Sequence, residues 1–275
     1  MKTIQRVVLR ACCTYLQYNT LKMLRHLFRW QPAASLCDDY EIKLINGILG
    51  VQQPGVVGSL SYMTPLGRGV NRNKWDWYGF GKHNNSFWCC YGTTIEQFAK
   101  LGDSIYFKSV ADTASKTSAG TLYVAQFIAS TLQLEAGTVV TQKTKLSTQT
   151  GSNGGAMAVL AVNLTVSVED RSNAASFGSG AKTFNMKVRA PGWAAEGSTL
   201  VVLRAGHVLV PSSSTEATYP VVPGTFIDVV APSGGWQGGD VVSGSFAMTP
   251  RLKPINDKRP AYKNVVSTQG YSDYN

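Results

Sequence analysis

The sequence changes character near residue 105, and this change restricts the chain to folds in which a helical part precedes a β part. Before residue 105, apolar residues recur every three or four positions, which is the period of an amphipathic helix. Residues 15–30 and 37–49 are predicted helices, separated by a break at Pro32. The buried face of the first predicted helix consists of Leu16, Leu21, Leu24, Leu27 and Phe28.

After residue 105, the apolar residues alternate with polar ones, and β-branched residues and Gly/Ser turns become frequent. This pattern is typical of strands in an antiparallel β-sandwich. The predicted strands are residues 122–130, 138–146, 158–168, 183–188, 200–203, 226–230 and 241–248. The fold class is therefore predicted to be mixed α and β, with the helices first.

Residues 86–107, SFWCCYGTTIEQFAKLGDSIYF, join the two parts and contain two adjacent thiols. Thr93 is a predicted N-cap, and Glu96 three residues later completes a capping box. Cys89 and Cys90 then stand just before a helix N-terminus, where backbone amides and the helix dipole favour a thiolate. This position suits a nucleophile or a metal ligand; the alternative is a pair of small buried apolar residues. The apolar residues of the predicted helix are Ile95, Phe98, Ala99 and Leu101.

The composition excludes some classes of function. The net charge is +10, but Lys and Arg are scattered along the chain, so we predict no nucleic-acid partner. No apolar run is long enough for a membrane span, and Arg6 and Arg10 interrupt the N-terminus so that no clear signal peptide is predicted. The compartment stays open. The number of cysteines, five, is odd, and four of them form neighbouring pairs, so we predict no disulfide framework.

Residues 86–107 closely resemble the corresponding stretch of the β-L-arabinofuranosidase family, glycoside hydrolase family 127 (GH127), and the plant-type members look most similar. The resemblance covers roughly residues 18–270. It also includes YNTLK at 18–22, RHLFRW at 25–30, NGILG at 46–50, YMTPLG at 62–67 and residues 253–262.

Members of this family have an (α/α)6-barrel catalytic domain followed by a β-sandwich domain. The resemblance therefore implies an apparently truncated chain with three parts: a divergent segment at residues 1–17, the C-terminal portion of the barrel at 18–104, and an antiparallel β-sandwich at 105–275.

The resemblance also implies a chemistry, the release of terminal β-L-arabinofuranose from glycans or glycoproteins with retention of configuration. In the family, the cysteine that matches Cys89 is the nucleophile, and a zinc ion is bound by it and by the cysteine that matches Cys90. Glu41 and Tyr62 match positions of the sugar pocket. His83 lies six residues before Cys89 and is a further candidate zinc ligand.

Two departures from the family pattern put the activity in doubt. The family's other zinc ligands form a Glu-x-Cys arrangement just before a Tyr-Asn pair, and Tyr18-Asn19 without a gap places Cys13 and Tyr15 there, which do not match. Cys12 or Cys13 would reach the site only after a shift of two helical residues, about 200° of rotation. No residue of the chain is assigned to the general acid/base.

We therefore expect a chain that is incomplete as a catalyst. The alternative is a non-catalytic remnant, in which the β-sandwich contacts carbohydrate or binds a partner. Exposed apolar faces of the barrel helices would in either case favour self-association.

Overall fold

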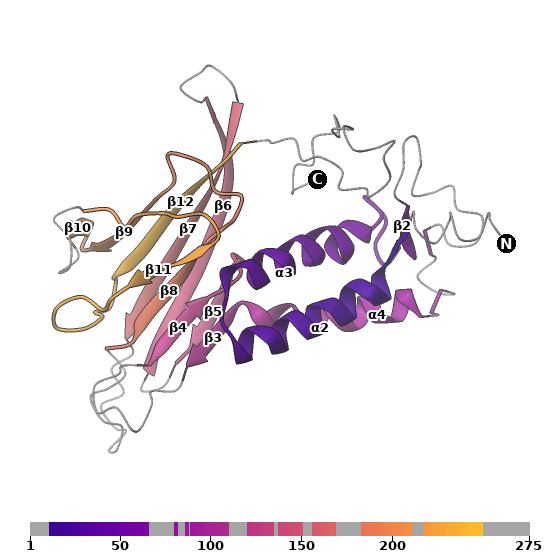
Figure 1. The fold of residues 1–275 in the computed structure, drawn as a ribbon, viewed down its shortest axis with the longest axis horizontal. Helices are drawn as coiled ribbons and strands as arrows, with labels where there is room; N and C mark the ends of the chain where they lie inside the picture. The colour runs from indigo at the N-terminus through magenta and orange to yellow at the C-terminus, as the bar shows by residue number, and fades with distance from the viewer. Residues whose placement is uncertain are drawn as a thin grey trace, which may run out of the picture. The chain divides into compact units, whose positions relative to one another are not determined.

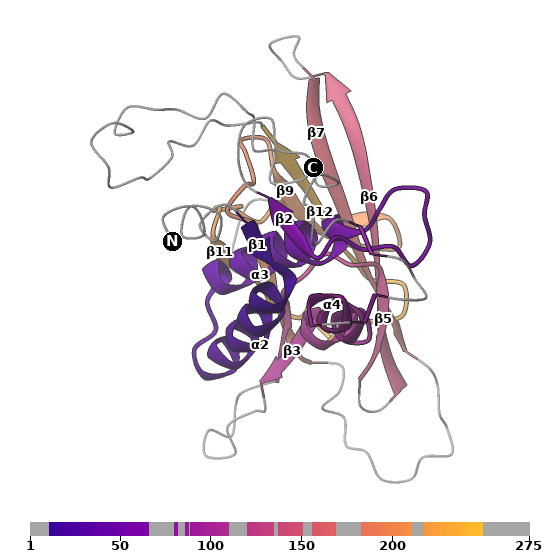
Figure 2. The same ribbon diagram turned by 90° about the vertical axis from the view of Figure 1, so that its right-hand side faces the viewer.

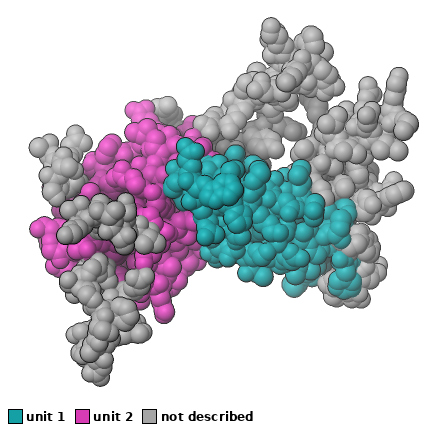
Figure 3. Space-filling model, turned by 60° about the horizontal axis from the view of Figure 1, so that its bottom comes forward, with its two compact units in different colours: residues 1–32, 36–103, 250–275 teal, residues 33–35, 104–249 magenta. Residues whose placement is uncertain are grey.

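The structure is a computed structural model. It describes residues 11–65, 80–81, 86–87, 89–109, 120–134, 137–150, 156–168, 183–210 and 217–249. The chain forms two compact units, shown in Figure 3. Unit 1 consists of residues 1–32, 36–103 and 250–275, and unit 2 of residues 33–35 and 104–249.

Most of the described helical structure belongs to unit 1 (Figures 1 and 2). The α-helices are α2 (Thr14–Trp30), α3 (Ala34–Gly47) and α4 (Cys90–Phe98), and the 3-10 helices are Leu49–Val51 and Leu101–Ser104. Strands β1 (Ala11–Cys13) and β2 (Met63–Pro65) pair antiparallel. Within the described residues, no helix is long and apolar enough to cross a membrane.

The helix predicted at residues 15–30 is confirmed as α2, but part of its predicted buried face is wrong. The buried residues of α2 are Thr14, Tyr18, Leu21, Leu24 and Phe28. Leu16 is 61% exposed. Two residues correspond to a rotation of about 200°, so Leu16 lies on the side of the helix opposite Tyr18.

The C-terminus of α3 approaches the N-terminal half of α2 at Gly47. A Cβ atom added at Gly47 would lie 2.5 Å from Cγ of Gln17, so only glycine fits between the two helices without a shift. The structure also places the start of α3 at Ala34, three residues before the predicted start.

Unit 2 consists mainly of two sheets. The larger sheet has the strand order β10-β9-β12-β7-β6-β5, and the smaller has the order β11-β8-β4-β3. The strands are β3 (Tyr106–Ser109), β4 (Thr121–Val124), β5 (Ser130–Gln133), β6 (Thr138–Thr150), β7 (Ala156–Val168), β8 (Asn185–Ala190), β9 (Thr199–Arg204), β10 (His207–Leu209), β11 (Thr225–Val229) and β12 (Val241–Met248). The mixed α and β fold class is confirmed, whereas the barrel portion stays a prediction.

The arrangement of the small sheet differs from the predicted antiparallel one, because β4 pairs with β8 in parallel. In addition, the predicted strand 122–130 is two strands. After Val124 the chain leaves the small sheet, and from Ser130 it runs in the large sheet as β5. This change of sheet lies inside the stretch LYVAQFIAS, which contains no Gly, Pro or Asn that would mark a turn.

Both sheets of unit 2 contribute to one apolar core. Val124, Val188 and Val229 of the small sheet and Val140, Val166 and Phe246 of the large sheet are among its fully buried members. Trp236 is also fully buried, and its indole nitrogen donates a hydrogen bond to the carbonyl oxygen of Phe184 at 2.7 Å.

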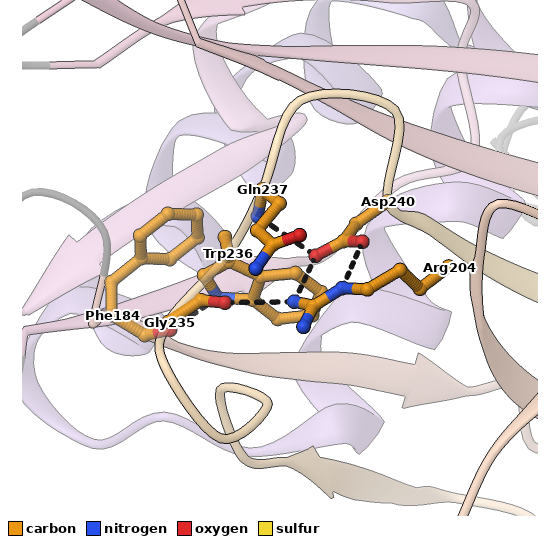
Figure 4. A network of polar contacts seen from close by, with 6 residues as sticks. All are labelled: Phe184, Arg204, Gly235, Trp236, Gln237 and Asp240. Atoms are coloured by element: carbon orange, nitrogen blue, oxygen red, sulfur yellow. Dashed lines mark hydrogen bonds and ion pairs between the residues drawn. The ribbon is translucent and has the colours of Figure 1, made fainter.

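A polar network lies beside this tryptophan (Figure 4). The guanidinium of Arg204 donates to both carboxylate oxygens of Asp240, at 2.9 and 2.8 Å, and to the carbonyl of Gly235 at 2.9 Å. The backbone amide of Gln237 also donates to Asp240. The network therefore closes the turn between residues 235 and 240 onto β9.

Candidate cysteine site

The candidate site begins at the N-terminus of α4. Cys90 is the first residue of the helix, and Cys89 occupies the N-cap position. The hydroxyls of Thr93 and Thr94 donate to the carbonyls of Cys89 and Cys90, at 2.9 and 2.8 Å. Both threonines therefore lie within the first turns of the helix, and the predicted N-cap at Thr93 is wrong. The predicted placement of the two thiols at a helix N-terminus is confirmed.

The buried side of α4 also differs from the predicted one. Cys90, Tyr91, Thr94 and Gln97 are buried at spacings of one helical face, whereas Ile95 is 56% exposed. The side chains of Cys90 and Tyr91 therefore point to the interior of unit 1.

The two cysteines have different environments. Cys89 is an exposed free thiol, whereas Cys90 is fully buried in an apolar cluster with Val51, Leu60 and Tyr91. Their sulfur atoms lie 3.9 Å apart. Cys90 is disulfide-bonded, a bond that the sequence analysis, which predicted no disulfide framework, did not anticipate.

Tyr62 contacts the exposed thiol directly. Its hydroxyl oxygen lies 2.6 Å from Sγ of Cys89, and the side chain is only 7% exposed. The ring of Tyr91 packs edge-on against the ring of Tyr62, with centroids 5.2 Å apart and an interplanar angle of 62°. Burial raises the pKa of Tyr91 above its ordinary value of 10.0, so this hydroxyl stays protonated at neutral pH.

The segment that carries Tyr62 is fixed by backbone hydrogen bonds on two sides. The amide of Ser61 donates to Val51 at 2.7 Å, and the amide of Gly81 donates to Leu60 at 2.8 Å. The hydroxyl of Ser59, which is buried, donates to the carbonyl of Gly81 at 2.7 Å. These bonds hold the segment between the 3-10 helix at Leu49–Val51 and residues 80–81.

Cys12 and Cys13 lie in β1, before the start of α2, so the argument from helix rotation does not apply to them. The main chain of Cys13 is paired with Met63, the residue after Tyr62. The hydroxyl of Thr14 also donates to the carbonyl of Tyr62 at 3.4 Å.

The other predicted site residues are Glu41 and His83. Glu41 is buried on α3, with 6% of its surface exposed, and its contact with a sugar stays a prediction. His83 lies outside the described residues. Among the side chains that the structure describes, no group of three or more His, Cys, Asp or Glu is placed to hold a metal ion.

Sequence reasoning selected Cys89, Cys90 and Tyr62 but missed two residues that complete their surroundings, Tyr91 and Gly81. Tyr91 follows Cys90 directly, but the predicted helix start at Thr93 placed it outside the helix. A Cβ atom added at Gly81 would lie 2.6 Å from the Tyr91 ring, and no sequence pattern marks such a close approach.

Comparison with known proteins supports the resemblance. Residues 8–103 match the family model of the β-L-arabinofuranosidase GH127 catalytic domain. This segment contains the whole cysteine site, and for it the resemblance to GH127 predicted from the sequence is confirmed. No curated protein sequence matches the chain.

Two solved structures have a similar fold. A GH127 β-arabinofuranosidase superposes with a TM-score of 0.55 and 18% identity, covering 88% of this chain and 33% of its own. A protein described as a glycoside hydrolase has a TM-score of 0.52 and 15% identity, covering 88% of this chain and 34% of its own. The chain thus spans about one third of the length of these structures.

Proposed function

We propose that the chain is a glycoside hydrolase-like protein of the retaining β-L-arabinofuranosidase type, with Cys89 as the nucleophile. Its substrates would be terminal arabinofuranose residues of glycans or glycoproteins. The observation that supports this most is the environment of Cys89, an exposed free thiol at a helix N-terminus that contacts the hydroxyl of Tyr62. The match of residues 8–103 to the GH127 catalytic domain supports the same reaction.

In the proposed reaction, the Cys89 thiolate donates an electron pair to the anomeric carbon, and the glycosidic C–O bond breaks. The departing oxygen takes a proton from a general acid. Water then attacks the same carbon and gives its proton to the conjugate base of that acid. The C–S bond breaks and the thiolate is released, so that two inversions give net retention. Tyr62 lies where it would donate a hydrogen bond to the sulfur, and Glu41 would contact the sugar.

The two thiols also fit part of a zinc site. Tetrahedral zinc with Zn–S bonds of about 2.3 Å separates two sulfur ligands by about 3.8 Å, and the Cys89 and Cys90 sulfurs lie 3.9 Å apart. Because Cys90 is disulfide-bonded, this bond must be reduced before Cys90 can bind a metal. A bound zinc ion would keep the thiols deprotonated near neutral pH.

Two thiolates alone should bind zinc weakly, and we assign no described residue to the general acid. We therefore propose that the chain is incomplete as a catalyst, with little turnover on its own. The main chain of Cys12 and Cys13 lies beside the segment that follows Tyr62, so a third thiol ligand is most simply sought there.

The experiment is hydrolysis of p-nitrophenyl β-L-arabinofuranoside by the reduced chain, with zinc content determined on the same sample. We expect zinc binding that is lost in Cys89→Ser and in Cys90→Ser, and any turnover to disappear with Cys89→Ser. Cys37→Ala is the matched control, since Cys37 is a cysteine buried on α3, away from the helix that carries Cys89 and Cys90. Glycan binding without zinc and without turnover would instead support the non-catalytic alternative.

A further inference from the structure

We propose that Tyr91 and Gly81 are positioning residues that set the location of the Cys89 sulfur through the ring of Tyr62. This inference rests on the proposed role of Cys89, but it concerns two residues that the proposed function does not use. It follows from a chain of three spatial contacts among four residues: Gly81 with Tyr91, Tyr91 with Tyr62, and Tyr62 with Cys89.

The first contact is the one that matters chemically. The Tyr62 hydroxyl oxygen and the Cys89 sulfur are 2.6 Å apart, so the position of the phenol ring decides where the sulfur can lie. The backbone of Leu60 and Ser61 and the hydroxyl of Ser59 form hydrogen bonds with Val51 and Gly81, so the segment just before Tyr62 has little freedom.

The second contact limits the ring of Tyr62 from the side. Tyr91 is 4% exposed, and its ring meets that of Tyr62 edge-on, an arrangement favoured by the quadrupoles of the two rings. Tyr91 lies on α4 only two residues after Cys89. The same helix therefore carries the sulfur and the ring that supports its hydrogen-bond partner.

The third contact closes the space behind Tyr91. A methyl group at Gly81 would lie 2.6 and 2.8 Å from two atoms of the Tyr91 ring, and 2.8 Å from Cβ of Ser86. Such distances force a displacement, because side chains do not approach this closely in well-packed interiors. The Tyr91 ring receives two of these three contacts, and on its other side it meets the ring of Tyr62.

These contacts predict that Gly81→Ala displaces Tyr91, that Tyr91 displaces Tyr62, and that the hydroxyl leaves the Cys89 sulfur. The test measures alkylation of Cys89 by iodoacetamide in the 275-residue chain without metal or reductant, followed by peptide mass analysis. The reaction is run near pH 9.5, above the usual thiol pKa of about 8.5, so that the rate reports the freedom of the sulfur.

A hydrogen bond to a thiolate withholds electron density from an electrophile. We therefore expect Tyr62→Phe to accelerate alkylation by about tenfold, the factor expected for loss of one hydrogen bond to a charged group. Gly81→Ala should accelerate it similarly. The double variant should react no faster than Tyr62→Phe alone, because Gly81 acts through Tyr62.

Gly102→Ala is the matched control, since a Cβ atom there meets nothing within 4 Å. Its alkylation rate should equal that of the wild type. Tyr91→Leu tests the same support from α4 in case Gly81→Ala fails to fold, and Tyr91→Phe, which keeps the ring, should behave as the wild type.

Fluorine NMR of 3-fluorotyrosine at position 62 gives an independent signal. Its resonance should move with Cys89→Ala, Gly81→Ala and Tyr91→Leu, but not with Gly102→Ala. The proposal is overturned if Gly81→Ala and Tyr91→Leu leave the resonance and the alkylation rate unchanged, or if the effects of Gly81→Ala and Tyr62→Phe simply multiply. Neither measurement needs sugar or zinc, so both can test the roles of Tyr91 and Gly81 even if the chain has no glycosidase activity.

Discussion

Asp240 places a carboxylate inside unit 2, with only 1% of its side chain exposed. Burial by itself favours the neutral acid, but the hydrogen bonds from Arg204 and from the Gln237 amide favour the anion. Their combined effect holds the pKa of Asp240 below its ordinary value of 3.8. The carboxylate is therefore ionised in the folded protein at neutral pH, and the hydrogen bonds from Arg204 stabilise this buried anion.

Arg204→Met should lower the free energy of unfolding by about 3 kcal/mol, because it leaves the buried charge of Asp240 without its main partner. The matched control is Lys187→Met, which breaks the exposed ion pair between Lys187 and Asp228. That change should cost only about 0.5 kcal/mol. Urea denaturation of the two variants beside the wild type checks the difference, and equal costs would contradict the role given to Arg204.

The pH dependence of this contribution has a definite sign. The unfolded chain binds a proton at Asp240 near its ordinary pKa of 3.8, whereas the folded chain binds it only at lower pH. The ionised network therefore stabilises the fold fully above about pH 5. The stabilisation declines as the pH falls through the folded pKa. The stability difference between the wild type and Asp240→Asn should shrink over the same range, and a constant difference between pH 7 and pH 3 would count against this assignment.

The helix α2 shows how a single element can have two apolar sides. Its buried residues face the interior of unit 1, but Leu16, Met23 and Trp30 are 61%, 54% and 79% exposed. These three residues recur every seven positions and so lie along one side of the helix. The predicted self-association through exposed helix faces would use this side.

We predict that Met23→Ser/Trp30→Ser shifts the chain toward the monomer in sedimentation equilibrium, because it removes most of the apolar surface of this side. Val222→Ser, at a residue of unit 2 that is 55% exposed, is the control and should leave the distribution unchanged. A wild-type chain that is monomeric at all concentrations would contradict the prediction.

The sequence was sufficient to predict strands and helices whose apolar pattern runs without interruption. It failed to predict the ends of elements that are set by side-chain hydroxyl hydrogen bonds or by uncommon turns. The alternation in residues 138–168 predicted most of β6 and β7. The start of α4 was predicted too late in the sequence, because threonine is a common N-cap residue. In the structure the hydroxyls of Thr93 and Thr94 instead donate to the carbonyls four residues earlier, at Cys89 and Cys90. Strand β10 was missed because its hairpin uses Ala205, with φ of 49°, beside Gly206 rather than a common Asn-Gly turn.

At the site, the sequence identified the thiols because adjacent cysteines are rare and their surroundings resemble a known family. It could not place Gly81 against Tyr91, since that approach depends on packing between segments that are distant in the sequence. The contact between Tyr62 and Cys89 could not be predicted from their spacing in the sequence either, although both residues were predicted to be site residues.

At the scale of the whole molecule, every core residue of unit 2 that the structure describes comes from unit 2 itself. We therefore predict that a fragment of residues 104–249 folds independently. Far-ultraviolet circular dichroism should show β structure, and heating should give one cooperative transition. A fragment that gives no cooperative transition would contradict the prediction, and a folded one provides the material to test carbohydrate binding by this part.

The parallel pairing of β4 with β8 has a consequence for the synthesis of the chain. Strand β4 pairs with β3 on one edge, but its other edge is completed by β8, which follows only after β5, β6 and β7. At a synthesis rate of about 5–20 residues per second, that edge stays open for seconds on the ribosome. During this time an open strand edge can pair with another nascent chain. The yield of soluble protein in cells should therefore depend on how quickly the ribosome reaches β8.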